Sequence, residues 1–421
     1  ALPMALEMLY DQYGDDKPVR KFYPAVKKWL EHMRYQYGKD GLITKDKYGD
    51  WCMPPEKPEL IHSEDPARQT DGTLISTAYF YRMCNWMKRF AELQGISADV
   101  EQFDQRSKET KAAFNKKFLT VNKGTNLTDG NHWLYPDSTF YGNNTVTANL
   151  LPLAFGMIED KDVEKQVKKN IIENIIVKNG GHVSTGVIGG SWIMRALSDM
   201  GRGDVAWLLA TQKSYPSWGY MAEQGATTTW ELWNGDTANP AMNSGNHVML
   251  LGDLVTWAFQ KVGGIQPSNE SVGYKRFKLS PDYNVDEINH INVSYNSIYG
   301  KIVSRWEKKA GKLFWHVEIP ANTKALVDLP NGSTKELGSG SYDLTSPAPY
   351  TRRGEGSPQI SSALGSPLSG KLEGSFLYEN ASFPECHSAT MTELPNGDLV
   401  ATYFGGTKER NPDCCIWVSR K

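Results

Sequence analysis

The chain has 421 residues, of which 46 are Lys or Arg and 48 are Asp or Glu, so its formal net charge is −2. This length exceeds one ordinary hydrophobic core and predicts two or three domains. Charges of both signs are mixed along the chain, which excludes the basic stripe of a nucleic-acid-binding protein and the acidic tail of a solvating segment.

Other absences exclude further classes of protein. No run of about 18 apolar residues occurs, so the sequence predicts no membrane span. The five cysteines are scattered and odd in number, which indicates neither a disulfide framework nor a zinc site; they are Cys52, Cys84, Cys386, Cys414 and Cys415. There is no GxxxxGK(S/T) or HExxH motif, and the glycine-rich GVIGGSW at 186–192 follows no predicted strand. We therefore expect no cofactor and no metal.

Residues 1–264 have the periodicity of amphipathic helices. The apolar stripe of one such helix consists of Val19, Phe22, Val26, Trp29, Leu30 and Met33. Pro24 lies within this stripe and marks either a kink or the true start of the helix. Further helices are predicted near 74–93, 145–157, 161–177, 189–200, 204–213 and 243–262. We expect Ser97 and Asp204 to cap helix N-termini, and Gly201 and Gly263 to end helices.

Long loops rich in Gly, Asn, Pro and Trp separate these helices, at 39–70, 119–144, 178–188 and 214–242. Loops of this length inside a compact domain are usually functional. Helices joined alternately by short turns and long loops indicate a helical toroid, with a cleft at the end that carries the loops. The 13 tryptophans and 20 tyrosines suit a protein that stacks on sugar rings, and they equally suit a large helical core.

The pattern changes after residue 264. Leu313, Trp315, Val317 and Ile319 alternate with polar residues, and Ala310-Gly311 precedes them as a predicted hairpin turn. Residues 265–345 therefore predict an antiparallel β-domain. The segment 346–372 is rich in Ser, Pro and Gly and predicts a linker. A new strand-like segment occupies 373–421.

The chemistry-bearing candidates are carboxylates in the long loops. They are Asp50, Glu64, Asp65, Asp71, Asp137, Glu223, Glu231 and Asp236. Glu231 stands between Trp230 and Trp233. It is either a surface glutamate on a loop whose tryptophans point inward, or a catalytic carboxylate in an aromatic cleft, because an unpaired buried carboxylate is costly. Asp50, beside Trp51, has either a structural role in a turn or a role in binding sugar hydroxyls.

Two strings, YPSWGYMAEQGATTTWELWNGD at 215–236 and NSGNHVMLLGDLVTWAFQKVGGI at 243–265, resemble the bacterial α-L-rhamnosidases of glycoside hydrolase family 78. YGDW at 48–51, TVTANLLPLAFGM at 145–157 and GHVSTGVIGG at 181–190 support the resemblance, which covers about residues 1–345. It implies a mainly α, multidomain protein: an (α/α)6 catalytic toroid over 1–264, partial at its N-terminus, followed by an antiparallel β-sandwich over 265–345.

The resemblance also implies residue roles and an inverting mechanism that releases terminal, non-reducing L-rhamnose from rhamnosides or plant polysaccharides. Glu231 corresponds to the general base, and His247, next to Asn246, is expected to contact sugar hydroxyls. The aromatic wall and its neighbours are assigned to substrate binding; these are Asp50, Trp51, Trp218, Trp230 and Trp233. The family's general acid is a glutamate in an Arg-Glu stretch that this chain does not match. We expect it upstream of Ala1, so the chain by itself would hydrolyse rhamnosides weakly.

Two alternatives remain open. One is another (α/α)6 glycosidase, similar to trehalase or glucoamylase, and the other is a non-catalytic carbohydrate-binding fragment. Residues 373–421 resemble the start of a sialidase-like β-propeller, but they lack the Ser-x-Asp-x-Gly-x-x-Trp box and an arginine triad, so no activity is assigned to them. A periplasmic or secreted location is expected only if a signal peptide precedes residue 1. The expected partner is a rhamnose-containing oligo- or polysaccharide, with no nucleic acid and no membrane span.

Overall fold

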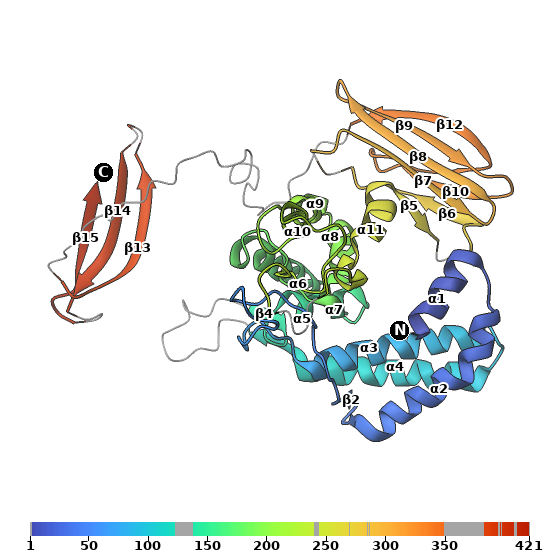
Figure 1. Ribbon diagram of the computed structural model, residues 1–421, viewed down its shortest axis with the longest axis horizontal. Helices are drawn as coiled ribbons and strands as arrows, with labels where there is room; N and C mark the ends of the chain where they lie inside the picture. The colour runs from blue at the N-terminus through green and yellow to red at the C-terminus, as the bar shows by residue number, and fades with distance from the viewer. Residues whose placement is uncertain are drawn as a thin grey trace. The chain divides into compact units, whose positions relative to one another are not determined.

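The computed structural model describes residues 2–122, 138–239, 244–268, 270–283, 285, 287–348, 383–394, 396, 398–407 and 411–420. The chain separates into two compact units, Ala1–Gly354 and Glu355–Lys421 (Figure 1). The first unit contains helices followed by two β-sheets, and the second contains one β-sheet. Among the helices that the structure describes, none is long and apolar enough to cross a membrane.

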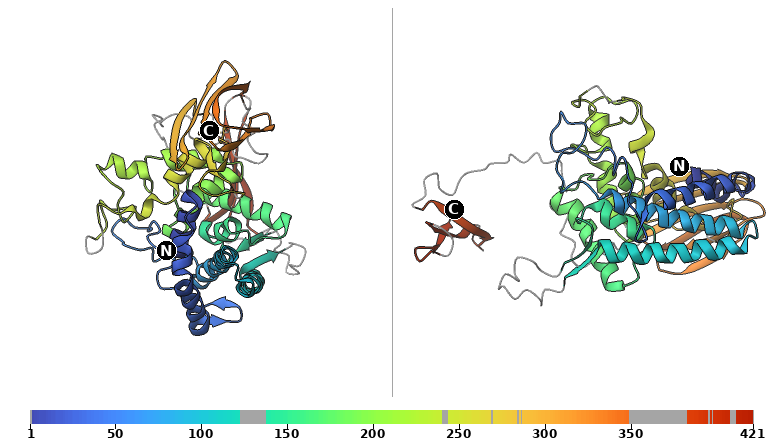
Figure 2. Two further views of the ribbon diagram at one scale, coloured as in Figure 1. Left: turned by 90° about the vertical axis from the view of Figure 1, so that its right-hand side faces the viewer. Right: turned by 90° about the horizontal axis from the view of Figure 1, so that it is seen from below.

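The first helices form hairpins whose shared core is apolar. Their bounds are α1 (Leu2–Tyr13), α2 (Lys17–Tyr37), α3 (Gly72–Glu92) and α4 (Ser97–Phe118). α3 and α4 lie side by side (Figures 1 and 2). The two-residue strands β1 (Gly38–Lys39) and β2 (Leu42–Ile43) follow α2 and pair with each other.

The buried face of α2 differs from the predicted stripe. Val19, Val26 and Leu30 are buried as expected, but Tyr23 joins them, whereas Phe22 is 37 % exposed and Trp29 is 49 % exposed. Tyr23 is held in the core by its hydroxyl, which donates to Asp99 Oδ2 over 2.6 Å. Pro24 lies inside the helix, so it does not mark the start.

Shorter helices complete the helical region. They are α5 (Val146–Ala154), α6 (Lys161–Glu173), η2 (Asn174–Lys178), α7 (Val187–Gly190), α8 (Ile193–Asp199), α9 (Gly203–Thr211), α10 (Trp218–Glu223), η4 (Val248–Leu251), α11 (Leu254–Trp257) and η5 (Ala258–Val262). A small hairpin, β3 (Leu119–Asn122) with β4 (Ser138–Tyr141), precedes α5. The prediction of paired helices with long loops between them is confirmed.

Helix caps were harder to predict than helix positions. Thr145 and Asp160 cap α5 and α6 through their side chains. Ser97 is the first residue of α4 rather than its cap, and Ile96 precedes it without a side-chain hydrogen bond. Asp204 lies in the first turn of α9, where its carboxylate accepts from the Arg202 guanidinium. Both predicted N-caps were therefore wrong, because a neighbouring residue already occupies the capping position.

Two four-stranded sheets follow the helices. One has the order β12-β9-β8-β7 and the other β11-β10-β6-β5. Their strands are β5 (Ile265–Pro267), β6 (Arg276–Leu279), β7 (His290–Ser297), β8 (Gly300–Lys309), β9 (Lys312–Ile319), β10 (Lys324–Asp328), β11 (Thr334–Leu337) and β12 (Gly340–Pro347). All neighbouring strands in these two sheets are antiparallel except β6 and β10, which are parallel because the chain completes three strands of the other sheet between them.

The alternation in β9 has the predicted consequence. Leu313, Trp315, Val317 and Ile319 are buried while the intervening residues are more exposed. Ala310 and Gly311 both have positive φ, 49° and 71°, between β8 and β9. Positive φ at both central residues characterises the hairpin turn whose twist matches that of the flanking strands. The predicted hairpin is confirmed.

Hydrogen bonds connect the sheet β12-β9-β8-β7 to both ends of the helical region. Trp306 Nε1 donates to the Val262 carbonyl over 3.0 Å, at the end of η5. Tyr295 donates its hydroxyl to Gln12 Oε1 over 2.9 Å, in α1. The β-strands therefore pack against the first and the last helix that the structure describes in this unit.

The second unit contains an antiparallel sheet with the order β13-β14-β15. Its strands are β13 (Glu385–Glu393), β14 (Leu399–Gly406) and β15 (Cys415–Arg420). Ile416 and Val418 of β15 are exposed. Of the predicted linker, only residues 346–348 fall within the described residues, so the predicted domain boundaries at 345 and 372 stay predictions.

Candidate active site

Two long loops, 44–71 and 212–247, meet through hydrogen bonds from side chains to backbone. Asn234 Nδ2 donates to the carbonyls of Pro58 and Leu60 over 2.7 and 2.9 Å. Thr237 Oγ1 donates to the Pro58 carbonyl over 2.8 Å. Asn234 is 1 % exposed, so these hydrogen bonds are buried, and burial strengthens the connection between the two loops. The segment that carries Glu231 is thereby fixed beside the segment that carries Trp51.

Glu231 is half-buried, and two hydrogen bonds to Ser244 fix it. The Glu231 N–H donates to the Ser244 carbonyl over 2.9 Å, and the Ser244 N–H donates to Glu231 Oε2 over 3.1 Å. Within the part of the chain that the structure describes, no hydrogen bond occupies Oε1. One carboxylate oxygen is thus oriented by backbone, and the other remains able to accept a proton from a ligand or a water.

The two tryptophans that flank Glu231 point into the protein. Trp230 is 9 % exposed and Trp233 is 2 % exposed. Trp230 packs on Gly235, where a Cβ atom would lie 2.8 Å from the indole. These rings anchor the loop and leave the carboxylate between them half-exposed. Their burial leaves little indole surface for a sugar, so the predicted contact of Trp230 and Trp233 with a substrate remains untested.

Trp218 is the half-buried indole on this side of the site. It begins α10, and its Nε1 donates to the Leu250 carbonyl over 2.9 Å. Its ring lies edge-on to Trp233, with centroids 5.4 Å apart and an interplanar angle of 70°. Trp233 therefore supports Trp218 from the core side.

His247 stands at the N-terminus of η4, and its tautomer follows from its contacts. Its backbone N–H donates to the Thr229 carbonyl over 2.7 Å, and its Nδ1 accepts the Met249 N–H over 3.2 Å. Because Nδ1 accepts, the neutral ring carries its proton on Nε2, which can donate to a hydroxyl. Asn246 is exposed, and its backbone bonds to the Ser244 hydroxyl.

Cys52 follows Trp51 in the first of the two long loops and is buried. Its side chain is 3 % exposed, and its backbone has a positive φ of 57°. Burial, followed by the nearby carboxylates of Glu231 and Asp50, raises the pKa of the Cys52 thiol to about 12. The thiol therefore stays protonated at neutral pH.

Asp50 is buried, and both of its oxygens are engaged by the protein. Oδ2 accepts from the Thr147 hydroxyl, and Oδ1 accepts from the Ile188 and Gly189 N–H groups over 2.8 and 3.1 Å. Burial raises the pKa of Asp50 above its usual value, while these hydrogen bonds act against that rise. Asp50 thus anchors the Trp51 segment to α5 and α7, and its contact with a substrate stays a prediction.

Glycines make this close approach possible. A Cβ atom at Gly186 would overlap the carbonyl oxygens of Asp50 and Trp51, and one at Gly189 would overlap Thr147 Oγ1. The Val187 N–H also donates to the Trp51 carbonyl over 2.7 Å. The backbone of the glycine-rich stretch at 186–192 therefore packs directly against the backbone of Asp50 and Trp51.

The other candidate carboxylates have protein partners or lie elsewhere. Asp71 caps α3, Glu223 pairs with Lys213 over 2.8 Å, and Asp236 accepts the Tyr220 hydroxyl over 2.6 Å. Glu64 is exposed, and Asp65 accepts the Ala67 N–H over 2.9 Å. Asp137 lies outside the described residues. Glu231 differs from the exposed Glu64 in being half-buried and oriented by Ser244, and its role as general base stays a prediction.

A salt bridge between half-buried Arg195 and buried Asp253 was not predicted from the sequence. Asp253 is 1 % exposed, and its carboxylate accepts from Arg195 Nε over 2.5 Å and from the Arg195 N–H over 2.8 Å. Its own N–H donates to the Gly190 carbonyl over 2.9 Å. Burial raises the pKa of Asp253 to about 6, against the effect of Arg195. These bonds join the Gly252-Asp253 turn to α7 and α8. In the sequence, the Gly252-Asp253 turn itself was the only indication of this salt bridge.

In the described ranges, no group of three or more His, Cys, Asp or Glu side chains could hold a metal ion. The match of residues 1–262 to a six-hairpin glycosidase domain places the helical region in the six-hairpin class of glycosidase folds. Residues 1–262 match the model of the bacterial alpha-L-rhamnosidase 6 hairpin glycosidase domain, and residues 264–342 match that of the bacterial alpha-L-rhamnosidase C-terminal domain. The chain belongs to this bacterial α-L-rhamnosidase family.

Individual relatives agree with the family. An alpha-L-rhamnosidase of Formosa agariphila is 31 % identical over 334 residues, which are 78 % of this chain and 32 % of the relative. One from Streptomyces avermitilis is 28 % identical over 76 % of this chain and 28 % of its own length. The chain therefore spans about a third of the length of these curated relatives.

Solved structures show the same fold. The crystal structure of the Streptomyces avermitilis alpha-L-rhamnosidase complexed with L-rhamnose has a TM-score of 0.67 at 26 % identity, covering 82 % of this chain and 32 % of that one. The alpha-L-rhamnosidase from Dictyoglumus thermophilum has a TM-score of 0.70 at 27 % identity, covering 82 % and 39 %. The predicted toroid followed by a β-rich domain is confirmed.

Proposed function

We propose that this chain forms the base-bearing part of a glycoside hydrolase that releases terminal α-L-rhamnose from rhamnose-containing oligo- or polysaccharides. The observation that carries the proposal is Glu231, half-exposed and held by Ser244, in a chain of the α-L-rhamnosidase family. Hydrolysis of a glycoside commonly needs two carboxyl groups, one that protonates the leaving oxygen and one that acts on water or on the sugar. Glu231 is the second of these groups.

In the proposed inverting mechanism, the Ser244 N–H holds Oε2 of Glu231, and Oε1 accepts a hydrogen bond from a water. Glu231 takes a proton from this water as its oxygen bonds to the anomeric carbon, while a separate acid protonates the departing oxygen. In inverting enzymes the two carboxyl groups stand about 6.5–9.5 Å apart, which leaves room for the water. The described residues offer no second carboxyl for which we propose the acid role.

The sugar would be held by the remaining side chains of the two loops. Trp51 and Trp218 are half-buried indoles able to pack against the apolar face and methyl group of a 6-deoxy sugar. His247 would donate from Nε2 to a sugar hydroxyl, and the exposed amide of Asn246 could bond a neighbouring hydroxyl. Buried Trp230 and Trp233 would keep this arrangement in place.

Replacement of Glu231 by Gln tests the proposal, with Glu223→Gln as the matched control, since Glu223 lies in the same segment and is paired with Lys213. Loss of an oriented base typically lowers kcat about 10²–10⁴-fold. We expect this loss for an aryl α-L-rhamnoside with Glu231→Gln, no such loss with Glu223→Gln, and retained L-rhamnose binding by calorimetry in both. Proton NMR of the first product should show the inverted anomer.

Near-normal turnover by Glu231→Gln would remove Glu231 from the role of base. A wild-type chain that neither cleaves the rhamnoside nor binds L-rhamnose would refute the proposed function. A panel of aryl glycosides separates the alternatives, because preferred cleavage of glucosides would indicate a trehalase- or glucoamylase-like activity. Sugar binding without turnover of any glycoside would indicate a carbohydrate-binding fragment.

A further inference from the structure

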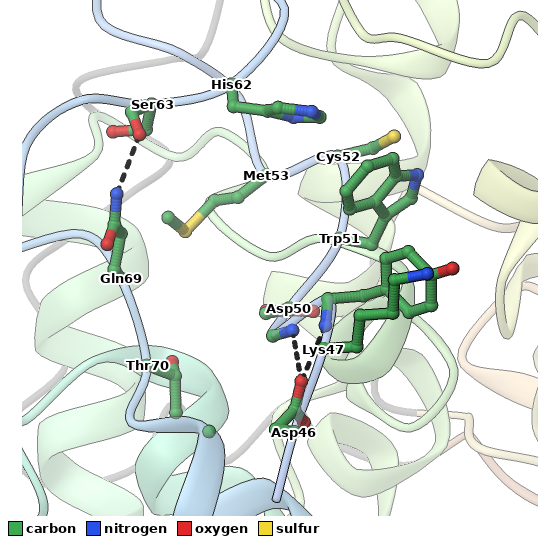
Figure 3. Close-up of a pocket in the computed structure, with 13 residues that line it drawn as sticks. Asp46, Lys47, Asp50, Trp51, Cys52, Met53, His62, Ser63, Gln69 and Thr70 are labelled. Atoms are coloured by element: carbon green, nitrogen blue, oxygen red, sulfur yellow. Dashed lines mark hydrogen bonds between the residues drawn. The ribbon is translucent and has the colours of Figure 1, made fainter.

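A pocket lies between the C-terminal half of α2 and the helix α4, with the β1–β2 hairpin along its rim. We call it the α2–α4 pocket, and Figure 1 labels α2, α4 and β2 around it. The pocket beside the candidate active site, shown in Figure 3, is lined by residues 46–53 and 62–72. The α2–α4 pocket is lined instead by residues within 31–43 and 106–110 and by Phe80. The two pockets are therefore built from different residues.

The β1–β2 hairpin has a fixed position against the helices. Its turn residues, Asp40 and Gly41, have positive φ, 52° and 80°, as in the turn whose twist matches that of the flanking strands. A Cβ atom at Gly41 would lie 2.7 Å from the Ala113 Cβ atom, so the turn packs closely on α4. The Ile43 N–H donates to the Thr77 hydroxyl over 3.0 Å, which joins β2 to α3. The hairpin is therefore a preformed wall of the α2–α4 pocket.

Two buried polar side chains of α4 line this pocket and have hydrogen-bonding atoms left for a ligand. Arg106 is 7 % exposed, and its Nη1 donates to Glu31 Oε1 over 2.7 Å. Within the described residues, Nε and Nη2 of Arg106 make no hydrogen bond. Thr110 is 3 % exposed, and in the same part of the chain its hydroxyl has no hydrogen-bond partner. Because buried polar groups are costly when left unbonded, a ligand that bonds these atoms gains affinity.

The charged groups that line the α2–α4 pocket balance one another. Apolar surface is contributed by half-buried Leu42 and by Tyr35, which is 86 % exposed. The charged lining residues are three cations and three carboxylates: Arg34, Lys39, Arg106, Glu31, Asp40 and Glu109. A charged ligand gains little from lining charges that sum to zero. A neutral polyol can use guanidinium donors and carboxylate acceptors together.

From these observations we propose that the α2–α4 pocket binds a neutral saccharide, as a second sugar site separate from the candidate active site. The inference rests on the proposed function, because a rhamnose-containing polysaccharide supplies sugar units besides the one that is cleaved. Arg106 donates to ring hydroxyls, Thr110 bonds a neighbouring hydroxyl, and the Tyr35 ring packs on the apolar face of the sugar. The second site would keep a polysaccharide on the protein between successive cleavages.

The test measures binding to the full chain by calorimetry with three probes: methyl α-L-rhamnoside, galactotetraose and the galacturonate tetrasaccharide. The first probe reports on the candidate active site, the second is neutral and lacks rhamnose, and the third carries a carboxylate on every ring. For the wild type we expect galactotetraose to bind at least about tenfold more tightly than the galacturonate tetrasaccharide. Saturation with methyl α-L-rhamnoside should leave galactotetraose affinity within about twofold, because the two sites are separate.

Thr110→Val and Tyr35→Ala test the α2–α4 pocket without disturbing the fold. Thr110→Val removes a hydroxyl that bonds nothing within the described residues, and the Tyr35 side chain is exposed. Each variant should weaken galactotetraose binding about three- to tenfold, the effect of one lost hydrogen bond or ring contact, while methyl α-L-rhamnoside affinity stays within about twofold. Tyr13→Ala, at a tyrosine of α1 that is 51 % exposed, is the matched control and should change neither affinity.

The outcomes separate the second sugar site from the proposed function. If methyl α-L-rhamnoside binds but galactotetraose does not, or if both variants bind galactotetraose as the wild type does, the second site is overturned and the proposed function stands. Tighter binding of the galacturonate tetrasaccharide would also overturn it, because the pocket would then select anions. If galactotetraose binds as expected but the chain neither binds methyl α-L-rhamnoside nor cleaves an aryl rhamnoside, the proposed function alone fails.

Discussion

Replacement of Asp50 by Ala should destabilise the helical region more than loss of an ordinary helix cap. The Asp50 carboxylate accepts three hydrogen bonds, from the Thr147 hydroxyl and from the Ile188 and Gly189 N–H groups. Each is worth about 1 kcal/mol net, and the interaction with the N-terminus of α7 adds about 0.5 kcal/mol. Release of a buried carboxylate offsets part of this loss. We expect the free energy of unfolding to fall by about 3 kcal/mol.

Asp71→Ala is the matched control, because Asp71 accepts the Thr73 and Leu74 N–H groups at the start of α3 but is exposed. Loss of such a cap costs about 1 kcal/mol. Urea unfolding followed by far-ultraviolet circular dichroism measures both. Asp50→Asn, which keeps one acceptor oxygen, should fall between wild type and Asp50→Ala and serves if the Ala variant does not fold. Equal destabilisation by Asp50→Ala and Asp71→Ala would refute the reasoning, because burial would then add nothing.

Two further predictions follow from the same region. Burial raises the pKa of Asp253 to about 6, so between about pH 4 and pH 6 the folded state keeps a proton that the unfolded state has released. The free energy of unfolding of the wild type should therefore fall by about 3 kcal/mol across this range, relative to that of Asp253→Asn. Parallel pH profiles of the free energy of unfolding in urea for the wild type and Asp253→Asn would contradict this prediction. Gly189→Ala should cost about 1–3 kcal/mol because the added methyl would overlap Thr147, whereas Gly190→Ala, with 3.8 Å to its nearest neighbour, should be near neutral in thermal unfolding.

Helix positions were predictable because apolar periodicity is local, but the choice of buried face was not always so. In α2, a spacing of three or four residues fits both Phe22 and Tyr23 beside Val19 and Val26. The structure buries Tyr23 because Asp99 of α4 accepts its hydroxyl. That partner lies 76 residues away, so a local pattern cannot reveal it.

In the β-domain, too, local features were predictable and the pairing of distant segments was not. The hairpin at Ala310-Gly311 was predictable, because its turn chemistry and the alternation in β9 are both local. The parallel pairing of β6 with β10 was not, because it depends on which sheet the chain returns to after β9.

At the candidate site, the role of Glu231 came from the family resemblance and remains a proposal. The sequence showed that two indoles flank this carboxylate, but not that both would be buried. Nor could the sequence show that both carboxylate oxygens of Asp50 accept hydrogen bonds from α5 and α7, because the turn chemistry around Gly49-Asp50 fits an exposed aspartate equally well. The Arg195–Asp253 pair left almost no local pattern at all.

The bonds of Asp50 also bear on the order in which the chain folds. They join residues 97 and 138 positions apart, whereas the hydrogen bonds inside α3 or α4 join near neighbours. Closing such long loops costs entropy that local helix formation does not, and contacts of high sequence separation slow folding. We expect the α3–α4 hairpin to form early and the Trp51 segment to dock late, so that a nascent chain acquires its proposed sugar-binding surface only after α7 has been synthesised.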